Sequence, residues 1–435
     1  MTSALRIGIA GLGTVGAATV RLLEEERELL ARRCGRPLEV RAVSARERGR
    51  SRGIDVSRYA WFDDPAALAA AAEVDVVVEL IGGADGVARE VARAALRQRK
   101  HLVTANKALL AHEGTALAAC AEAAGVALGF EAAVAGGIPI CKALREGLAA
   151  NPITRVYGIL NGTCNYILSA MREAVQRGER GDFAPILAEA QRLGYAEAEP
   201  SFDVDGIDTA HKLAILTGLA FGCRLDFEGI HIEGIRGIDG TDIAFALELG
   251  YHIKLLGITR RSEAGIEQRV HPCMVPRSAP IAHVEGVLNA VVADGRYVGA
   301  SFFEGRGAGG GPTASAVVAD VIEIARGARA PAFSVPAAAL DRLPRVPLEE
   351  RYGAYYIRLM VVDRPGVIAD VAGALRDHGV SVEAMVQRQR DPGEPVPLVM
   401  TTHETPEAAM QRTLAQIARL NSVVEPPHMI RIEAL

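Results

Sequence analysis

Aromatic side chains are scarce in this sequence. Phe, Trp and Tyr make up 5% of its 435 residues, whereas 45 residues are glycine and hydrophobic residues reach 49%. This composition favours a close-packed α/β architecture over a β-sandwich. A chain of this length exceeds one small core, so we expect two or three domains.

Three further absences exclude whole classes of protein. The six cysteines form no Cys-x-x-Cys pair, which argues against a zinc site and against a disulfide framework. With a formal net charge of −5 and only short basic patches, the chain is not expected to bind nucleic acid. No apolar run approaches the roughly twenty residues of a membrane span, and no signal-peptide pattern precedes the first strand. We therefore expect a soluble, cytoplasmic protein with no membrane partner.

A glycine-rich turn near the N-terminus is the first motif with a chemical meaning. A short apolar strand runs into Gly11-Leu-Gly-Thr-Val-Gly16, which opens a helix over 17–33. There Gly11 allows a tight turn, Gly13 lets a pyrophosphate approach the backbone, and Gly16 lets the helix pack on the strand. The pattern predicts a bound dinucleotide, with a ligand-free βα turn as the alternative. The predicted contacts are Gly11, Gly13, Thr14, Val15 and Gly16.

The loop after the second predicted strand, 38–43, indicates which dinucleotide is bound. An NAD site usually offers an acid here for the ribose hydroxyls, but this chain offers Ser44-Ala-Arg46-Glu-Arg48-Gly-Arg50. Because arginines suit a 2′-phosphate, we predict NADP bound by Arg46 and Arg48. NAD is the alternative since Glu47 lies among them, and a solvated basic loop would bind neither.

Two later strand ends and a second glycine loop point to the same crevice. The strands predicted over 74–80 and 101–104 end near Gly82 and Lys107, and ligands of open α/β sheets lie beyond such ends. Lys107 could equally cap the helix that follows it. The loop 304–313 opens a helix over 314–325 that could return to the cofactor, with a flexible connector as the alternative. The additional predicted cofactor contacts are Gly82, Thr104, Lys107 and Gly309.

An acidic loop followed by an apolar helix is the most informative segment of the chain. On the helix predicted over 207–220, Asp208 and Lys212 are four residues apart and share an apolar face. A lysine there needs a partner, and burial lowers its pKa. An exposed ion pair at helical spacing is the alternative. The carboxylates of the segment are Glu197, Glu199, Asp203, Asp205 and Asp208.

With these residues in view, the chain resembles the homoserine dehydrogenase family. The residues after 355, which include Asp363-Arg-Pro-Gly-Val-Ile368, look like an ACT domain, a ligand-sensing βαββαβ module. The resemblance implies reversible NAD(P)-dependent oxidation of L-homoserine to L-aspartate 4-semialdehyde, on the route to threonine and methionine. Besides the first glycine turn, it rests on the segments Thr104–Lys107, Phe130–Pro139, Gly158–Thr163 and Asp203–Lys212.

The resemblance also implies roles for individual residues. Lys212 would be the acid/base and Lys107 its partner, in contact with the substrate oxygen and the cofactor. Both can act near neutral pH if burial and mutual repulsion lower the pKa of each lysine. Asp208 would hold Lys212, and carboxylates of the loop would grip the substrate ammonium. The implied substrate contacts are Glu197, Asp203, Gly162 and Thr163.

A monovalent cation site is implied in the loop 131–138. Glu131 and backbone carbonyl oxygens would hold Na⁺ or K⁺ there, and a glycine turn buried between domains is the alternative. The carbonyl oxygens would be those of Val134, Gly136 and Ile138.

We predict an α/β fold in three parts. A Rossmann-type dinucleotide-binding domain over 1–131, completed by the returning segment 314–340, precedes an α+β catalytic and dimerisation domain over 132–313. A linker over 341–354 leads to a separate ACT-like regulatory domain over 355–435. The central part has more apolar strand than its helices can cover, so we expect a homodimer or homotetramer. Threonine is the leading effector for the tail, and a tail that only assembles subunits is the alternative.

Two other functions fit the same outline. A semialdehyde dehydrogenase would need a nucleophilic cysteine with a nearby histidine, and Cys164 is the one cysteine in a plausible loop. A non-catalytic amino-acid sensor would need only the tail, and the joint presence of Lys107, Asp208 and Lys212 argues against it.

Overall fold

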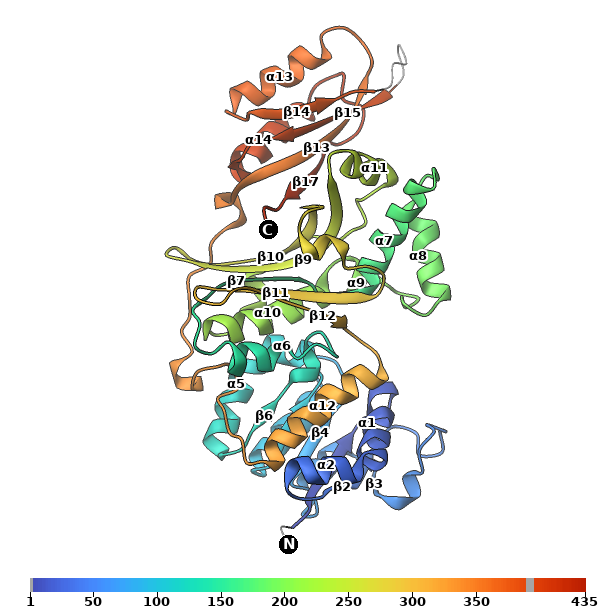
Figure 1. The fold of residues 1–435 in the computed structure, drawn as a ribbon, viewed down its shortest axis with the longest axis vertical. Helices are drawn as coiled ribbons and strands as arrows, with labels where there is room; N and C mark the ends of the chain where they lie inside the picture. Colours follow the sequence, from blue (N-terminus) through green and yellow to red (C-terminus); the bar gives the residue numbers. More distant parts are fainter. Residues whose placement is uncertain (1–2, 389–394) are drawn as a thin grey trace.

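The computed structural model describes residues 3–388 and 395–435 of the chain. Figure 1 shows an elongated molecule with three parts stacked along its long axis: the N-terminal domain, a central sheet and the C-terminal tail. The C-terminus lies where the tail meets the central sheet, and the N-terminus lies at the opposite end of the molecule. Among the residues described, no helix is both long and apolar enough to span a bilayer.

The N-terminal domain is a parallel six-stranded sheet covered by helices. Its strand order is β3-β2-β1-β4-β5-β6, so the winding direction changes between β1 and β4, where an open α/β sheet leaves a crevice for a ligand. The predicted Rossmann-type sheet is therefore confirmed. The strands are β1 (Leu5–Ala10), β2 (Leu38–Ser44), β3 (Ala60–Phe62), β4 (Val76–Glu79), β5 (His101–Thr104) and β6 (Leu128–Gly129). The helices are α1 (Thr14–Glu25), α2 (Arg27–Cys34), α3 (Pro65–Ala70), α4 (Val87–Arg97) and α5 (Lys107–Ala124).

Two elements of this domain differ from the prediction. The helix expected over 17–33 begins at Thr14 and is interrupted at Glu26, so that α1 and α2 replace it. The strand β3 was not predicted, because three residues are too few to show a period.

The helix α12 (Gly310–Ala325) returns from the central part to the N-terminal domain. It begins at Gly310 rather than at 314. Its residues Val317 and Val321 share a buried cluster with Ile7 and Ile9 of β1. The second glycine-rich loop is thereby brought to the first one.

The central part is built on a large sheet of 11 strands, two of which pair beside the main path. Along that path the order is β12-β11-β7-β9-β10-β17-β13-β15-β14. The pairs within the central part are antiparallel, apart from β8 beside β10, which confirms the predicted antiparallel sheet. Its strands are β7 (Ile153–Ile159), β8 (His231–Ile232), β9 (Tyr251–Ser262), β10 (Gly265–Pro276), β11 (Leu288–Gly295) and β12 (Gly299–Arg306). Its helices are α6 (Ile140–Lys142), α7 (Gly162–Gln176), α8 (Phe183–Arg192), α9 (Ser201–Val204), α10 (Ile207–Phe221) and α11 (Gly240–Glu248).

The helix α10 is the innermost helix of the molecule. Of its 15 residues, 13 are buried, which matches the rule that a helix apolar on all sides is enclosed. It packs against α5 of the N-terminal domain on one side and against β7 and β9 of the central sheet on the other. The helix expected over 140–149 is different: α6 continues as a π-helical turn over Ala143–Gly147.

The C-terminal tail has the predicted βαββαβ order and a buried core of its own, yet its sheet is not separate. Strand β17 pairs in parallel with β10 of the central part, through Cys273 with Arg431 and Met274 with Ile432. The predicted linker over 341–354 is shorter, because β13 begins at Tyr352. The tail contains β13 (Tyr352–Val362), α13 (Val367–Asp377), β14 (Val382–Val386), β15 (Pro395–Thr402), β16 (Thr405–Pro406), α14 (Glu407–Ile417) and β17 (His428–Ile432).

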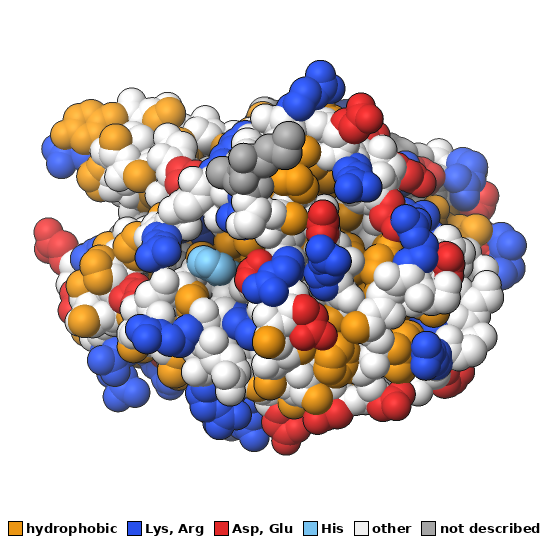
Figure 2. Space-filling model, turned by 90° about the horizontal axis from the view of Figure 1, so that it is seen from below, with side chains coloured by type: hydrophobic (Ala, Val, Ile, Leu, Met, Phe, Trp, Pro, Cys, Tyr) orange, Lys and Arg blue, Asp and Glu red, His pale blue; other side chains and the backbone are white. Residues whose placement is uncertain are grey.

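The charges at the N-terminal end of the molecule are mixed. Figure 2 shows this end from below, with basic and acidic side chains interspersed over the face in view and apolar side chains between them. Several of these charges form ion pairs, such as Arg6 with Asp75 at 2.6 Å. The face therefore has no continuous surface of one sign.

Candidate active site

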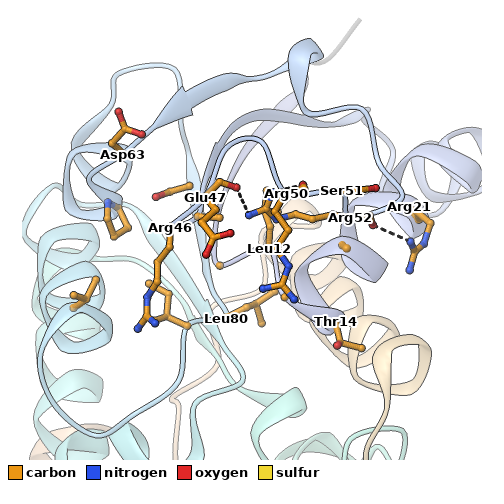
Figure 3. A pocket seen from close by; sticks show the side chains of 18 residues that line it. Leu12, Thr14, Arg21, Arg46, Glu47, Arg50, Ser51, Arg52, Asp63 and Leu80 are labelled. Carbon is orange, nitrogen blue, oxygen red and sulfur yellow. Dashed lines mark hydrogen bonds between the residues drawn. The ribbon is translucent and has the colours of Figure 1, made fainter.

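A pocket of about 870 Å³ opens beyond the carboxyl ends of β1 and β2. It lies between the glycine-rich turn and the loop after β2, and Leu80 and Ile81 from the end of β4 also line it. Figure 3 shows Thr14 and Arg21 of α1 on one side and the loop that carries Arg46 on the other. A pocket of this volume is large enough for a cofactor-sized ligand.

The three glycines of the turn each meet a different spatial demand. Gly11 has φ +102°, and a Cβ there would lie 2.5 Å from the Leu80 carbonyl oxygen. A Cβ on Gly16 would lie 2.0 Å from the Gly11 carbonyl oxygen, so the helix packs on the turn only without a side chain. Around Gly13 no atom lies within 4 Å of such a Cβ, and no side chain caps α1. The first N–H groups of α1, at Thr14 and Val15, are thus free to bind an anion.

The arginines near the pocket are only partly those expected from the sequence. Arg46 lines the pocket, but Arg48 does not: its guanidinium lies 5.8 Å from the centroid of the Trp61 ring. Arg50, Arg52 and Arg21 line the pocket as well and were not among the predicted contacts. The run of basic residues after β2 could have indicated Arg50 and Arg52. The path of the loop decides which of these side chains line the pocket.

Glu79 at the end of β4 organises the next turn. Its buried carboxylate accepts hydrogen bonds from Thr104 Oγ1 at 2.6 Å and from the backbone N–H groups of Ile81 and Gly82. The hydroxyl of Thr104, a predicted cofactor contact, therefore donates within this turn, and Thr104 does not line the pocket. Gly82 has φ +88°, which only glycine adopts without strain.

The second glycine-rich loop meets the first at α1. Gly309, with φ +119°, precedes the first residue of α12. A Cβ on Gly310 would lie 3.3 Å from Thr14, so α12 starts directly against the first turn of α1. The loop thus borders the glycine turn, as the sequence predicted.

Two lysines share one buried carboxylate between the N-terminal domain and the central sheet. Lys212 Nζ donates to Asp208 Oδ2 at 2.7 Å and to the Leu160 carbonyl oxygen at 2.6 Å, while Lys107 Nζ lies 2.9 Å from Asp208 Oδ1. Asp208 and Lys212 come from the first turns of α10, and Lys107 is the first residue of α5. Asn106 caps that helix, because its Oδ1 accepts from the Leu109 N–H at 3.0 Å.

The electrostatics of this cluster separate the two lysines. Burial, reinforced by the charge of Lys107, lowers the pKa of Lys212, and Asp208 offsets only part of this. Burial also opposes the charge of Lys107, but Asp208, with Asp203 and Glu197, outweighs it and raises its pKa. A lowered pKa is thus confirmed for Lys212, and the same prediction is wrong for Lys107, which is half exposed toward the acidic loop. Burial opposes ionised Asp208 too, yet Lys212 and Lys107 hold its pKa below the ordinary range.

Asn161 is a member of the cluster that sequence reasoning missed. Its Nδ2 donates to Asp203 Oδ1 and to Asp208 Oδ2, both at 2.8 Å. Its Oδ1 accepts from the Cys164 N–H at 2.8 Å and caps α7. The sequence indicated that a helix begins after Asn161. It did not indicate the contacts with Asp203 and Asp208, which come from a different part of the chain. Burial and Asp208 raise the pKa of Asp203.

The remaining predicted substrate contacts surround this cluster. Glu197 is exposed and close enough to Lys107 to raise its pKa. Thr163 Oγ1 donates to the Tyr195 carbonyl oxygen at 2.7 Å, and Gly162 packs so tightly that a Cβ would lie 2.7 Å from the Val287 carbonyl oxygen. Two other carboxylates of the loop have local partners instead: Glu199 accepts from the Ser201 N–H, and Asp205 pairs with Arg236.

An aromatic stack joins the two helices that carry the lysines. The ring of His211, next to Lys212, lies 4.6 Å from Phe227 and 5.5 Å from His112 of α5, measured between centroids. Burial and His112 lower the pKa of His211 to about 4, so the ring is neutral near pH 7 and acts as a packing group. Sequence reasoning missed this stack.

Cys164 cannot serve as a nucleophile. It is fully buried, and its Sγ donates to the Asp203 carbonyl oxygen at 3.2 Å. Burial, with Asp203 and Asp208, raises the pKa of the thiol well above its ordinary value. Because a nucleophilic cysteine must be a thiolate, the semialdehyde dehydrogenase alternative loses its one candidate.

Glu131 is the acidic centre of the loop 131–138. Its carboxylate accepts from the N–H groups of Cys141 at 2.9 Å and Lys142 at 2.8 Å. Burial and the nearby Asp320 raise its pKa to about 7. The Lys142 ammonium pairs with Asp320 at 3.0 Å rather than with Glu131. The loop runs through Val134 to Gly136, φ +41°, and the Ile138 carbonyl oxygen accepts from the Ile140 N–H.

A second group of metal-type ligands has an internal explanation. His271, Cys273 and Glu433 come close together where β10 meets the tail. Arg269 donates to His271 Nε2 at 3.1 Å and pairs with Glu433 at 3.0 Å. A bound cation would compete with this guanidinium, so we assign the group to the charge network of the junction.

Family models cover most of the chain. A model described as homoserine dehydrogenase matches residues 139–322, and one described as homoserine dehydrogenase, NAD binding domain, matches residues 11–131. An ACT domain model matches residues 355–421.

Curated relatives and solved structures give the same result. Homoserine dehydrogenase of Neisseria gonorrhoeae is 45% identical and that of Pseudomonas aeruginosa 44% identical, each over 99% of both chains. The structure of a homoserine dehydrogenase from Thiobacillus denitrificans is 44% identical and has a TM-score of 0.92 over 99% of this chain and 98% of its own. A hyperthermophilic archaeal homoserine dehydrogenase in complex with NADPH is 27% identical, with a TM-score of 0.62 over 74% of this chain and 97% of its own.

Proposed function

This chain belongs to the homoserine dehydrogenase family and oxidises L-homoserine to L-aspartate 4-semialdehyde with a nicotinamide dinucleotide; on that premise, we propose that Lys212 is the acid/base of the reaction. The observation that carries the proposal is the buried contact of Lys107 and Lys212 with the one carboxylate of Asp208. Lys212 deprotonates more easily than Lys107, because burial and the charge of Lys107 lower the pKa of Lys212, whereas the pKa of Lys107 is raised.

Oxidation of the alcohol requires a hydride and a proton to leave the substrate. A bound nicotinamide dinucleotide would supply the acceptor for the hydride that leaves the carbon carrying the hydroxyl group. Neutral Lys212 takes the hydroxyl proton at Nζ, and in the reverse direction it returns that proton to the aldehyde oxygen. Lys107, which stays charged, donates to the same oxygen and stabilises its negative charge as the proton leaves. Asp208 holds both lysine side chains in place.

The substrate ammonium group binds on the acidic side of this cluster. Asp203 is held by Asn161 at 2.8 Å, within the same hydrogen-bond network as Asp208, and Glu197 lies at the exposed edge. We assign Asp203 the inner contact and Glu197 the outer one, with the backbone N–H groups of Gly162 and Thr163 completing the site. A cationic amino group gains from this excess of carboxylates.

We propose NADP as the preferred cofactor. The residues around the pocket fit it: free N–H groups at the start of α1 suit the pyrophosphate, and arginines border the end of β2, where the adenosine ribose lies in this fold. Glu47 and Asp63 also line the pocket and could accept from ribose hydroxyls, so NAD is the weaker alternative.

Replacing Arg46 with Asp should raise the KM for NADP roughly ten- to a hundredfold and change the KM for NAD far less. The new carboxylate repels a 2′-phosphate but can accept from a ribose hydroxyl. Steady-state kinetics with each cofactor measure the difference. Arg48→Asp is the matched control, since Arg48 does not line the pocket. Equal losses for both cofactors in Arg46→Asp would show that this side chain does not contact the phosphate.

We also propose that the loop 131–138 holds Na⁺ or K⁺. The donor set fits, because a buried carboxylate and backbone carbonyl oxygens are the ligands of hard cations. Burial and Asp320 raise the pKa of Glu131 to about 7, so a bound cation would stabilise its ionised form. The ligands would be Glu131 and the carbonyl oxygens of Val134, Gly136 and Ile138.

A homodimer or homotetramer is the proposed assembly. Strand β12 forms the edge of the central sheet, and the turn before it carries exposed Tyr297 and Val298, followed by Phe302. Apolar side chains at a sheet edge favour contact with another subunit.

The tail is proposed to bind threonine and to inhibit the enzyme. Gly366, with φ +99°, precedes α13, so the free N–H groups of this helix can receive a carboxylate, and Asp363 can receive the ammonium group. Inhibition needs a coupling free energy, typically about 1–3 kcal/mol, between this site and the active site.

Replacing Asp363 with Ala should raise the threonine concentration needed for half inhibition at least roughly tenfold and leave basal turnover unchanged. Titration of threonine into an assay of homoserine oxidation measures it. The control is Asp377→Asn at the other end of α13, where the carboxylate is paired with Arg376. A wild-type enzyme that does not respond to threonine would remove the proposal.

A further inference from the structure

Residues 231–238, between α10 and α11, lie between the active site and the tail, and we call them the bridging segment. The segment starts as β8, which pairs with β10 through His231 and Ile232. It ends before the cap of α11. Neither the reaction nor the binding of the cofactor, as described above, uses any of its residues.

One side of the bridging segment is fixed to α9. The Ile235 N–H donates to the Val204 carbonyl oxygen at 2.8 Å. A Cβ on Gly234 would lie 2.2 Å from that same oxygen, so the two backbones are in direct contact. Because α9 carries Asp203, a shift of the segment displaces this carboxylate.

The other side of the bridging segment is fixed to strand β17 of the tail. Arg431 Nη1 donates to Glu233 Oε2 at 2.8 Å. Arg431 is only 4% exposed, and its other nitrogens donate to both carboxylate oxygens of Glu407, at 2.7 and 3.1 Å. Near the far end of the segment, a Cβ on Gly237 would lie 3.3 Å from His428 Nε2. Strand β17 therefore contacts both ends of the segment.

We propose that Glu233 and Arg431 are positioning residues for the oxidation of homoserine. Their ion pair ties β17 to the bridging segment, and the segment holds α9 so that Asp203 lies at the substrate ammonium. The tail thus supplies part of the scaffold of the active site, besides any effector that it binds. The inference rests on the proposed role of Asp203 in substrate binding.

The charges around the pair make its geometry well defined. Arg431 is enclosed by carboxylates of two elements, Glu233 on the segment and Glu407 at the start of α14, and Tyr355 donates to Glu407 at 3.0 Å. Arg431 and Glu407 are buried, whereas the side chain of Glu233 is 40% exposed, so the buried pair fixes Arg431 and Arg431 in turn holds Glu233. Glu233 is the residue to substitute, because Arg431 keeps Glu407 as its partner when Glu233 is removed.

Glu233→Ala should raise the KM for homoserine roughly ten- to a hundredfold, because a displacement of about 1 Å at a binding group has effects of this size. The KM for NADP should not change. A loss of folded enzyme would lower kcat at constant KM, so the two causes give different results. Glu233→Gln keeps an oxygen that accepts from Arg431 and should restore most of the wild-type KM.

Two further variants complete the experiment. Glu248→Ala removes another contact between the tail and the central part, with Arg388, away from α9, and should leave the KM for homoserine unchanged. Asp203→Asn tests the role of Asp203 directly. If Asp203→Asn raises the KM and Glu233→Ala does not, the positioning role is wrong and the substrate contact stands. If neither variant changes it, both fail.

Discussion

Lys212→Ala is expected to lower turnover by roughly 10²- to 10⁴-fold, the usual contribution of a general acid/base. The affinity for NADP should stay nearly unchanged, because Lys212 does not line the nucleotide pocket. The variant should fold, since Asp208 keeps Lys107 and Asn161 as partners. Steady-state kinetics with homoserine and binding of NADP to the free enzyme measure the two quantities.

The pH profile gives the same prediction a second readout. Only neutral Lys212 accepts the hydroxyl proton, so kcat/KM for oxidation should rise with pH through a pKa below the ordinary 10.5 of lysine, lowered by burial and Lys107. Lys212→Ala should lose this limb. Lys100→Ala is the matched control: it removes another buried lysine, which bonds the Ala71 carbonyl oxygen in the N-terminal domain. Near-normal turnover in Lys212→Ala would refute the assignment.

Asp208→Asn is expected to destabilise the protein by about 3–5 kcal/mol and to lower turnover at least roughly a hundredfold. The substitution keeps the shape of the side chain but leaves two ammonium groups, Lys107 and Lys212, without their shared carboxylate. Unfolding in urea at pH 7 and steady-state kinetics measure both effects. Glu199→Gln, which removes an exposed carboxylate of the same loop, should change neither.

The stability difference should depend on pH with a defined sign. The pKa of Asp208 is held below its ordinary value of 3.8, although burial alone would raise it, because Lys212 and Lys107 outweigh burial. A depressed pKa contributes stability that is complete above the unfolded value and is lost as the pH falls below it. The gap between wild type and Asp208→Asn should therefore be full at neutral pH and shrink below about pH 4. A gap that does not shrink would contradict the linkage.

Local patterns were enough to predict the centre of the site. The helix expected over 207–220 is α10 at Ile207–Phe221, and the spacing of Asp208 and Lys212 predicts their contact directly. The glycine turn was equally readable, because each glycine answers a local steric demand. Such features depend on residues close together in the sequence.

Features that join distant segments were not predictable from the sequence alone. Asn161 contacts Asp203 and Asp208 only because α7 and α10 start at the same place. The pKa of Lys107 rises chiefly because Asp208, which is distant in sequence, lies beside it, and the neighbours of Lys107 in sequence do not reveal this. Arg52 lines the pocket and Arg48 does not, which depends on the path of one loop.

Because β17 pairs with β10, the chain has no clean recombination boundary before β13. Cutting it there would expose the edge of β10 and remove charged partners: Arg269 would keep Glu267 but lose Glu433, and Asp242 would lose Arg358. The archaeal homoserine dehydrogenase, matched over 97% of its length by 74% of this chain, is a shorter protein. A chimera or a minimal enzyme made from this chain would therefore need replacements at Asp242 and along the exposed edge of β10. A truncated enzyme without these replacements would lose its scaffold together with its sensor.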